Sequence, residues 1–288
     1  ETIYDLQFLP ESGHLIQGIK TQLAFKAVNY YGKPVKVKGI IYNQNHDSIC
    51  SFETEHNGMG KIDFTPDQTT YYAKHRSNQN IQTCNLPKVA ISGSLINVLP
   101  IHNDSIAISI KSTDTIKKHL ILRKANDIYL NQIVLNQNEN IVLCTKPLPM
   151  GVYQLTLFDD KWQHICQRLV FVQLSKQMNV SMNFDQKIHA PKDNEKMNIK
   201  VLDENKQAVE GVFSFSVVNE QMLQYSEQYR ENMLSKMLLQ NELKSEVHFP
   251  SYYFTDANHV KLKQLDLVML TNGWSRIDWD SLKSNNKE

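Results

Sequence analysis

Hydrophobic and polar positions alternate over short runs through most of this 288-residue chain. In residues 35–42, for example, Val35, Val37 and Ile41 point one way while two lysines point the other. Alternation over so few residues indicates a strand with one buried face. Turn-forming residues recur between the runs, roughly every 8 to 12 residues. This spacing predicts β-sandwiches, and no strand–helix–strand pattern appears that would indicate a doubly wound α/β fold.

The clearest pair of runs lies in residues 148–172. Two apolar runs, 152–158 and 165–172, flank a polar connector at 159–164. Each run has the length of a strand and is rich in β-branched, aromatic and leucine side chains. The stretch therefore predicts a β-hairpin, which we expect to close the second of three sandwiches.

A short sequence similarity between segments of the chain indicates the domain organisation. AVNYYGKPV at 27–35 resembles VLDENKQAV at 201–209, and residues 158–165 form a looser third copy. Each is a strand end followed by a polar turn, so the likeness indicates repeated units. We predict three tandem sandwiches joined by short, semi-rigid linkers. Their predicted bounds are 1–87, 88–174 and 175–288.

The pattern changes within the third unit, where a strand predicted at 212–218 is followed by helical spacing over 220–243 and 260–270. We predict a helical elaboration over 220–271, packed on the third sandwich. Its first stripe would form a core face, with a partner groove as the alternative. The stripe residues are Met222, Tyr225, Tyr229, Met233 and Met237, then Leu262, Leu265 and Met269. Two further apolar segments are predicted: a short strand or packed loop at 252–254, and an anchor formed by Trp274, Ile277 and Trp279.

Composition narrows the class of protein. A hydrophobic content of 41% with 21% charged residues is ordinary for a globular protein. A net charge of +1 gives no electrostatic reason to expect nucleic acid or an anionic membrane as a partner. No apolar run approaches the roughly 20 residues of a membrane span. The sequence begins at Glu1 without a Met, and strand-like sequence starts within a few residues, so we expect an interior or processed piece of a longer protein.

The four cysteines leave two alternatives open. Cys50 could pair with Cys84 and Cys144 with Cys166, which would give one bridge in each of the first two units. Free thiols are the favoured alternative, because Cys144 and Cys166 both lie in apolar strands.

Motifs that would carry catalysis are missing from the sequence. Gly58–Met59–Gly60 is too short for a phosphate loop, and Ser92–Gly93–Ser94 starts a strand instead of a nucleophile elbow. Asp159–Asp160 lie in a turn, where solvated carboxylates are the simpler interpretation. No two histidines have the i, i+4 spacing of a helical zinc site. We therefore expect no enzyme activity, no catalytic residues, no metal and no cofactor.

Two tyrosine pairs, Tyr71–Tyr72 and Tyr252–Tyr253, could form a sugar-stacking platform. Neighbouring residues on a strand face opposite ways, so we expect one tyrosine of each pair to lie in the core. Trp162 in the hairpin turn and Cys166 in its second strand are interpreted as packing residues or contacts between neighbouring domains.

Several segments together resemble macroglobulin-like domains. The resemblance is strongest to the long α2-macroglobulin-related envelope proteins of Bacteroidetes-type bacteria, some of which carry a TonB-receptor plug-like region. Residues 265–279, LDLVMLTNGWSRIDW, resemble a segment typical of the same proteins. The other matching segments are LQFLPESG at 6–13, AFKAVNYYGKPV at 24–35, GMGKIDFTP at 58–66, LPMGVYQLTLFD at 148–159 and QRLVFV at 167–172.

The resemblance implies fibronectin-III-like, seven-stranded sandwiches and export to the periplasm or to the outer-membrane-associated cell surface. Some relatives trap proteases through a bait segment and a Cys–Gln thioester. None of the four cysteines here begins a Cys-Gly-Glu-Gln motif, so the thioester does not carry over to this chain.

Three functions follow as hypotheses. The first is a non-catalytic structural and interaction segment of a larger exported macroglobulin-like cell-envelope protein. Its partners would be other domains of the same parent protein or other envelope proteins. The second is a protease-trapping module with residues 219–258 as bait. The third is a carbohydrate-binding β-sandwich that uses exposed tyrosine or tryptophan.

Overall fold

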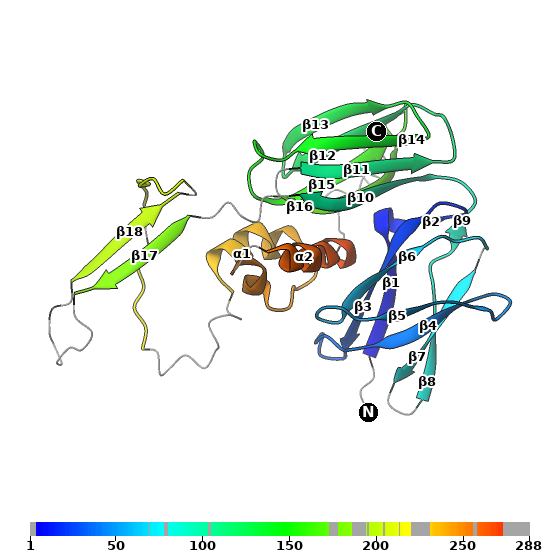
Figure 1. Ribbon diagram of the computed structural model, residues 1–288, viewed down its shortest axis with the longest axis horizontal. Helices are drawn as coiled ribbons and strands as arrows, with labels where there is room; N and C mark the ends of the chain where they lie inside the picture. Colours follow the sequence, from blue (N-terminus) through cyan, green and yellow to red (C-terminus); the bar gives the residue numbers. More distant parts are fainter. Residues whose placement is uncertain are drawn as a thin grey trace, which may run out of the picture.

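The computed structural model describes residues 4–68, 70–77, 80–102, 105–172, 178–185, 194, 196–203, 205–212, 214–219, 231–255 and 258–272. Strands dominate this part of the chain, and they form two β-sandwiches and a separate hairpin (Figure 1). The predicted class, a mainly β protein of fibronectin-III- or immunoglobulin-like sandwiches with a minor helical portion, is confirmed.

The first sandwich packs a three-stranded sheet, ordered β1-β3-β6, against a four-stranded sheet, ordered β5-β4-β7-β8. Phe8, Phe25 and Phe52 meet between the sheets with ring centroids 5.0 to 5.9 Å apart. Alternation along each strand brings these rings to the inner faces, as the sequence predicts. The strands are β1 Tyr4–Pro10, β3 Thr21–Asn29, β4 Lys38–Asn43, β5 Ser48–Glu53, β6 Met59–Phe64, β7 Tyr71–Ser77 and β8 Asn80–Asn85.

The second sandwich packs a sheet ordered β10-β11-β14 against one ordered β13-β12-β15-β16. The predicted hairpin is confirmed as β15 and β16, which pair antiparallel. Every residue of β15 is buried, because one face meets the sandwich core and the other meets the helical segment. The strands are β10 Ser94–His102, β11 Ser105–Ser112, β12 Lys118–Lys124, β13 Asp127–Val134, β14 Asn138–Cys144, β15 Gly151–Phe158 and β16 His164–Val172.

Short elements connect the two sandwiches. The 3-10 turn η1, Glu11–Gly13, follows β1 directly. Two strands of two residues each, β2 (Leu15–Ile16) and β9 (Val89–Ala90), pair in parallel.

The internal likeness of the sequence corresponds to one recurring turn. The Asn29 side chain accepts hydrogen bonds from the backbone N–H groups of Tyr31 and Lys33, both at about 3 Å. Asn43, Asp159 and Asp203 make the same pair of bonds to the residues two and four positions on. The fourth residue of each turn is left-handed; these residues are Gly32, His46, Trp162 and Lys206. An Asx side chain thus caps each of these turns.

The third unit is represented by a single hairpin in the described residues. β17, Asn179–Phe184, pairs antiparallel with β18, Met197–Leu202. The predicted strand at 212–218 is wrong, because its described residues have no strand structure. The three predicted domain boundaries stay a prediction.

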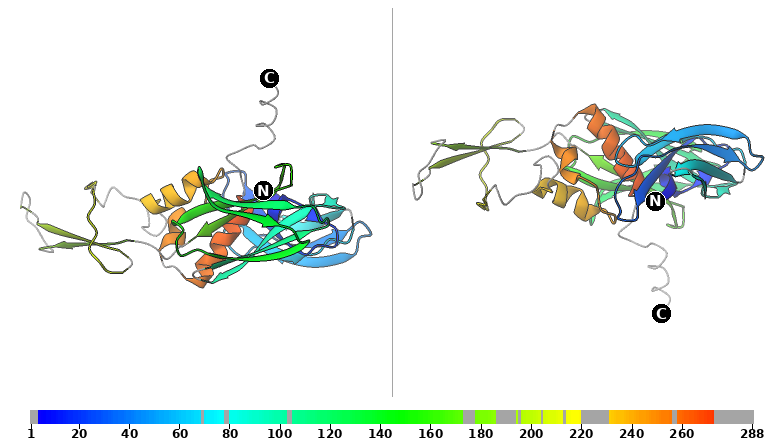
Figure 2. Two further views of the ribbon diagram at one scale, coloured as in Figure 1. Left: turned by 90° about the horizontal axis from the view of Figure 1, so that it is seen from above. Right: turned by 90° about the horizontal axis from the view of Figure 1, so that it is seen from below.

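Two α-helices and two 3-10 helices follow the β17–β18 hairpin in the described residues. They are α1 Met233–Leu238, η4 Gln240–Glu242, η5 Pro250–Phe254 and α2 His259–Thr271. α2 lies where the two sandwiches meet, against β3, β6 and β16, and α1 lies farther from the first sandwich (Figures 1 and 2). Neither α-helix of the described chain has the length and hydrophobicity needed to cross a membrane.

The prediction that this helical segment packs on the third sandwich is wrong. Val268 and Met269 of α2 join one buried cluster with Met59 of β6 and with Leu169 and Phe171 of β16. The physical reason is that β16 carries apolar residues on both faces, so its outer face requires a cover.

The predicted core faces of the helices are partly corrected. Met233 and Met237 are 75% and 58% exposed, whereas Leu239 is fully buried, so the methionine stripe is not the core face. Leu265 and Met269 are buried as predicted. Residues 252–254 belong to η5 and not to a strand, which agrees with the packed-loop alternative. Met222, Tyr225, Tyr229, Trp274, Ile277 and Trp279 lie outside the described residues.

The four cysteines are free thiols. Strand register places Cys50 and Cys84 in one row of the sheet, three strand spacings or about 14 Å apart. A disulfide needs Cα atoms within about 7 Å, so this pair cannot bridge. Cys144 and Cys166 lie in opposite sheets of the second sandwich. Burial raises the pKa of Cys166 to about 12, which makes it an unreactive packing residue.

Gly58 provides a test of the first sandwich. Its φ is +71°, and an added Cβ would lie 2.4 Å from the carbonyl oxygen of Ala27. Gly32 has a φ of +72° with nothing within 4 Å of that position. We expect Gly32→Ala to lower the free energy of unfolding by about 1 kcal/mol, the cost of the left-handed backbone alone. Gly58→Ala adds a backbone clash and should cost about 3 kcal/mol. Urea unfolding of both variants measures the difference, and equal losses would contradict the packing.

Candidate functional site

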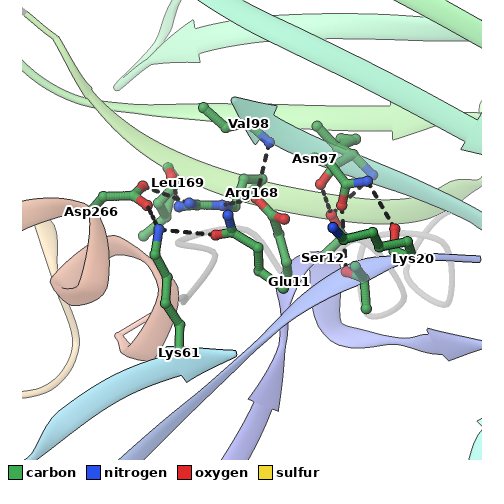
Figure 3. Close-up of polar contacts among 12 residues, drawn as sticks. Glu11, Ser12, Lys20, Lys61, Asn97, Val98, Arg168, Leu169 and Asp266 are labelled. Atoms are coloured by element: carbon green, nitrogen blue, oxygen red, sulfur yellow. Dashed lines mark hydrogen bonds and ion pairs between the residues drawn. The ribbon is translucent and has the colours of Figure 1, made fainter. Parts of the chain in front are cut away.

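The two sandwiches and the helical segment meet at a cluster of four charged side chains. Arg168 comes from β16, Glu11 from η1, Asp266 from α2 and Lys61 from β6 (Figure 3). We call these four residues the junction cluster. The side chain of Arg168 is on the same side of β16 as the core residue Cys166. Because β16 is an edge strand, the Arg168 guanidinium reaches the rim of the second sandwich.

The distances in the junction cluster define a continuous ion-pair network. Arg168 Nε lies 3.0 Å from Glu11 Oε1, and its Nη2 lies 2.6 Å from Asp266 Oδ1. Its Nη1 donates to the carbonyl oxygen of Leu169 at 2.5 Å. Lys61 Nζ lies 3.1 Å from the second oxygen of Asp266. The Arg168 side chain is only 2% exposed, so these partners replace its hydration.

Glu11 reaches the second sandwich because the backbone turns sharply after β1. Ser12 and Gly13 have φ values of 66° and 85°, in the left-handed region. Glu11 Oε1 also accepts a hydrogen bond from the backbone N–H of Val98 in β10, at 2.9 Å. The Ser12 hydroxyl donates to the carbonyl oxygen of Ile96 and accepts from its N–H. The η1 turn is thus bonded to the edge of the second sandwich.

The charges of the junction cluster balance, but the two carboxyl groups differ in their pKa. Burial raises the pKa of Glu11 by more than Arg168 lowers it, so the net pKa is above 4.5. Burial also raises the pKa of Asp266, but Arg168 and Lys61 outweigh it and the net pKa falls below 3.8. Glu11 Oε2 has no hydrogen-bond partner among the described residues. Asp266 is therefore the carboxylate that the network holds most firmly in its ionised form.

Further polar contacts extend the junction along the helical segment. The Lys26 ammonium donates to the Asn272 side chain at the end of α2, over 2.9 Å. The Tyr253 hydroxyl lies 3.0 Å from His56 Nε2, and the His56 ring stacks on Tyr252. Burial lowers the pKa of His56, so the neutral imidazole is favoured there. These contacts fix both η5 and α2 against the first sandwich.

The arrangement can hold domains together through ion pairs between their side chains. A cavity of about 330 Å³ lies beside Lys61 and Asp266, with Leu99 and Leu262 on its apolar side. Two of the charged groups at its wall, Lys61 and Asp266, are paired with each other. No group of three or more histidine, cysteine or acidic side chains within the described residues could hold a metal ion.

The residues singled out from the sequence have structural roles. Tyr71 and Tyr253 are buried while their neighbours are partly exposed, which confirms one core tyrosine in each pair. Asp159 caps the hairpin turn, where the ring of Trp162 stacks on His119 at 4.3 Å. Gly58–Met59–Gly60 leads into β6, and Ser92–Gly93–Ser94 into β10.

Sequence reasoning missed the junction cluster itself. The available signal was a single charge within an apolar run: Arg168 in QRLVFV and Asp266 in LDLVML. A lone charge that is surrounded by core residues requires a buried partner. The sequence alone does not say which distant residue supplies that partner.

Comparisons with known proteins show a general likeness and no family. No family model matches the chain, and no curated protein matches it. Solved structures similar to this chain include a biofilm-associated protein (BSP domain) and an α2-macroglobulin from Salmonella that had reacted with methylamine. They also include a two-domain fibronectin type III segment of chicken tenascin. Identities are 12%, 9% and 11%, and TM-scores are 0.30, 0.23 and 0.23.

The matched regions cover 58%, 71% and 57% of this chain. They cover 29% of the biofilm protein, 21% of the Salmonella protein and 99% of the tenascin segment. These are immunoglobulin- and fibronectin-like domains, and likenesses at this level of identity carry no function to this chain.

Asp266→Asn tests the electrostatics of the junction. The depressed pKa means that ionised Asp266 stabilises the fold above its ordinary pKa of 3.8 and that this contribution is lost as the pH falls further. We expect the free energy of unfolding of the wild type to be higher than that of Asp266→Asn, by an amount that is constant between pH 5 and 7. The difference should shrink below about pH 4. Unfolding midpoints from pH 2.5 to 7 measure it, and a pH-independent difference would contradict the assignment.

Proposed function

We propose that this chain is a non-catalytic structural and interaction segment of a larger, exported macroglobulin-like cell-envelope protein. In this role it holds two β-sandwiches in a fixed relative orientation. The observation that carries the proposal is the junction cluster, in which a buried arginine joins carboxylates from η1 and from α2. Such a network is costly to break, because each charge would be left buried without its partner.

Other observations fit the same role. The polar groups of the junction are bonded to one another and not arranged around a substrate. The sequence segments that resemble macroglobulin-like domains occur in both sandwiches, at 24–35 and at 148–159. The proposal extends to a location in the periplasm or at the outer-membrane-associated cell surface. The partners would be neighbouring domains of the parent protein or other envelope proteins.

The enzymatic alternative has a direct test. We expect the purified chain to leave a panel of ester, peptide, phosphate and glycoside substrates unchanged. Turnover that co-purifies with the protein and is lost on point substitution would overturn the non-catalytic role.

Arg168→Ala tests the structural role. Removing the guanidinium leaves Glu11 and Asp266 buried without their shared cation, so we expect a loss of about 3 to 5 kcal/mol in the free energy of unfolding. Arg76→Ala is the matched control, because Arg76 is an exposed arginine on β7 that lies outside the junction cluster. In small-angle scattering, only Arg168→Ala should broaden the distance between the sandwiches. An unchanged scattering profile and an unchanged unfolding midpoint would contradict the proposal.

The protease-trapping alternative predicts rapid cleavage within residues 219–258. In the described part of that segment, Leu239 and Tyr253 are fully buried and Val247 is nearly so. A buried segment is a poor protease substrate, so we expect residues 231–255 to resist trypsin, chymotrypsin and elastase. Mass spectrometry of a short digestion measures this. Fast cuts by all three enzymes within 231–255 would favour the bait function.

A further inference from the structure

The outer face of the β5-β4-β7-β8 sheet carries a groove, whose wall also includes Lys61 of the junction cluster and Ile62 from β6. Its volume is about 550 Å³. The helical segment packs against β3 and β6, on the other side of this sandwich (Figure 1). Among the described residues, no helix or strand covers the outer face of β4 and β7.

Strand register sets the side chains of the groove in rows. Tyr42 of β4 lies opposite Tyr72 of β7, and Ile40 lies opposite Lys74. These positions alternate with the core residues Ile41 and Ala73, so they face outward. The row after them places Lys38 beside Arg76.

The two tyrosine rings stack on each other and form a small platform, of which Tyr42 lines the groove. Their centroids are 5.5 Å apart and their planes differ by only 15°. The Tyr72 hydroxyl lies 2.6 Å from His46 Nδ1, which fixes the orientation of its ring. Tyr72 belongs to one of the two pairs that the sequence singles out for sugar stacking, and its actual companion is Tyr42 and not Tyr71.

Positive charge surrounds the platform. Lys74 Nζ lies 5.2 Å from the centre of the Tyr42 ring and 5.7 Å from that of Tyr72. Lys38 and Arg76 border the same groove, and the acidic residue on its wall is Glu53. The groove thus combines aromatic faces with an excess of cations.

We propose that this groove binds an acidic oligosaccharide, with uronic acid units as the recognised chemistry. The apolar C–H face of a sugar ring would pack on the Tyr42 ring, which stacks on Tyr72. Its carboxylate would accept hydrogen bonds from Lys74, Lys38 or Arg76. This site goes beyond the structural role of the junction and does not depend on it.

A single-stranded nucleic acid is the competing class of ligand, because it also requires stacking and positive charge. A protein surface that binds single strands follows the nucleic-acid backbone over several nucleotides and stacks successive bases on aromatic side chains. Here two rings lie in one row, and Glu53 would face the phosphates. The whole chain carries a net charge of only +1. The observations therefore favour the saccharide.

The experiment is calorimetric titration of the full chain with hexagalacturonate, with maltohexaose as the neutral analogue and a thymine hexanucleotide as the competing anion. We expect binding to hexagalacturonate that is at least tenfold tighter than to either of the others. Lys74→Ala and Tyr42→Leu should each weaken it at least tenfold. Lys88→Ala and Tyr31→Leu remove an exposed lysine and an exposed tyrosine elsewhere, and should change it less than twofold.

Three results would overturn the proposal. One is no binding of hexagalacturonate at millimolar concentration by a wild type with an intact unfolding transition. Another is equal binding of the hexanucleotide, which would indicate a general polyanion surface. The third is equal weakening by the control substitutions. Lys74 is exposed, so Lys74→Ala should keep the wild-type unfolding midpoint and separate a lost contact from a lost fold.

Discussion

The desolvation of the Arg168 guanidinium is the constraint on which the arrangement of the domains depends. A cation that is removed from water requires partners that are removed with it. Glu11 and Asp266 meet that requirement, and they come from η1 and from α2. The charge can be satisfied only when the second sandwich, the end of β1 and α2 are all in place. One side chain thus couples three segments that lie far apart in the sequence.

The helical segment completes this junction because both of its neighbours present suitable faces. β16 carries Leu169 and Phe171 on the side away from its own core, and these residues join the buried cluster of the helices. On the first sandwich, the outward residue Ala24 of β3 is fully buried and small, between Gln22 and Lys26. A small residue lets a helix approach the sheet closely. Lys26 donates to the Asn272 side chain at the end of α2, and Gln22 accepts from Lys61, which is paired with Asp266 of α2. The apolar contacts bury surface area between the helix and the sheets, and the polar contacts fix the position of the helix.

Local patterns in the sequence predict the local parts of this structure well. Alternation and turn residues predict the strand at 35–42, which overlaps β4, and the β15–β16 hairpin, since one buried face and a capped turn are both short-range features. β8 is missed because it is a polar edge strand without an apolar face. The packing of α2 and the partners of Arg168 are missed for a different reason. Both depend on contacts between residues that are more than 90 positions apart in the sequence. Local periodicity does not indicate which distant surfaces pack together.

A fixed junction also determines which surfaces of the first sandwich remain available. Its β1-β3-β6 sheet faces the helical segment, so that side is taken up by domain contacts. The outer face of β4 and β7 points to the other side of the same sandwich and keeps Tyr42, Lys74 and Arg76 near solvent. Because the junction cluster holds both sandwiches and α2 together, this face has a constant orientation relative to the rest of the segment. A rigid spacer of this kind presents its exposed face in one direction, which a flexible linker between the same two sandwiches would not do.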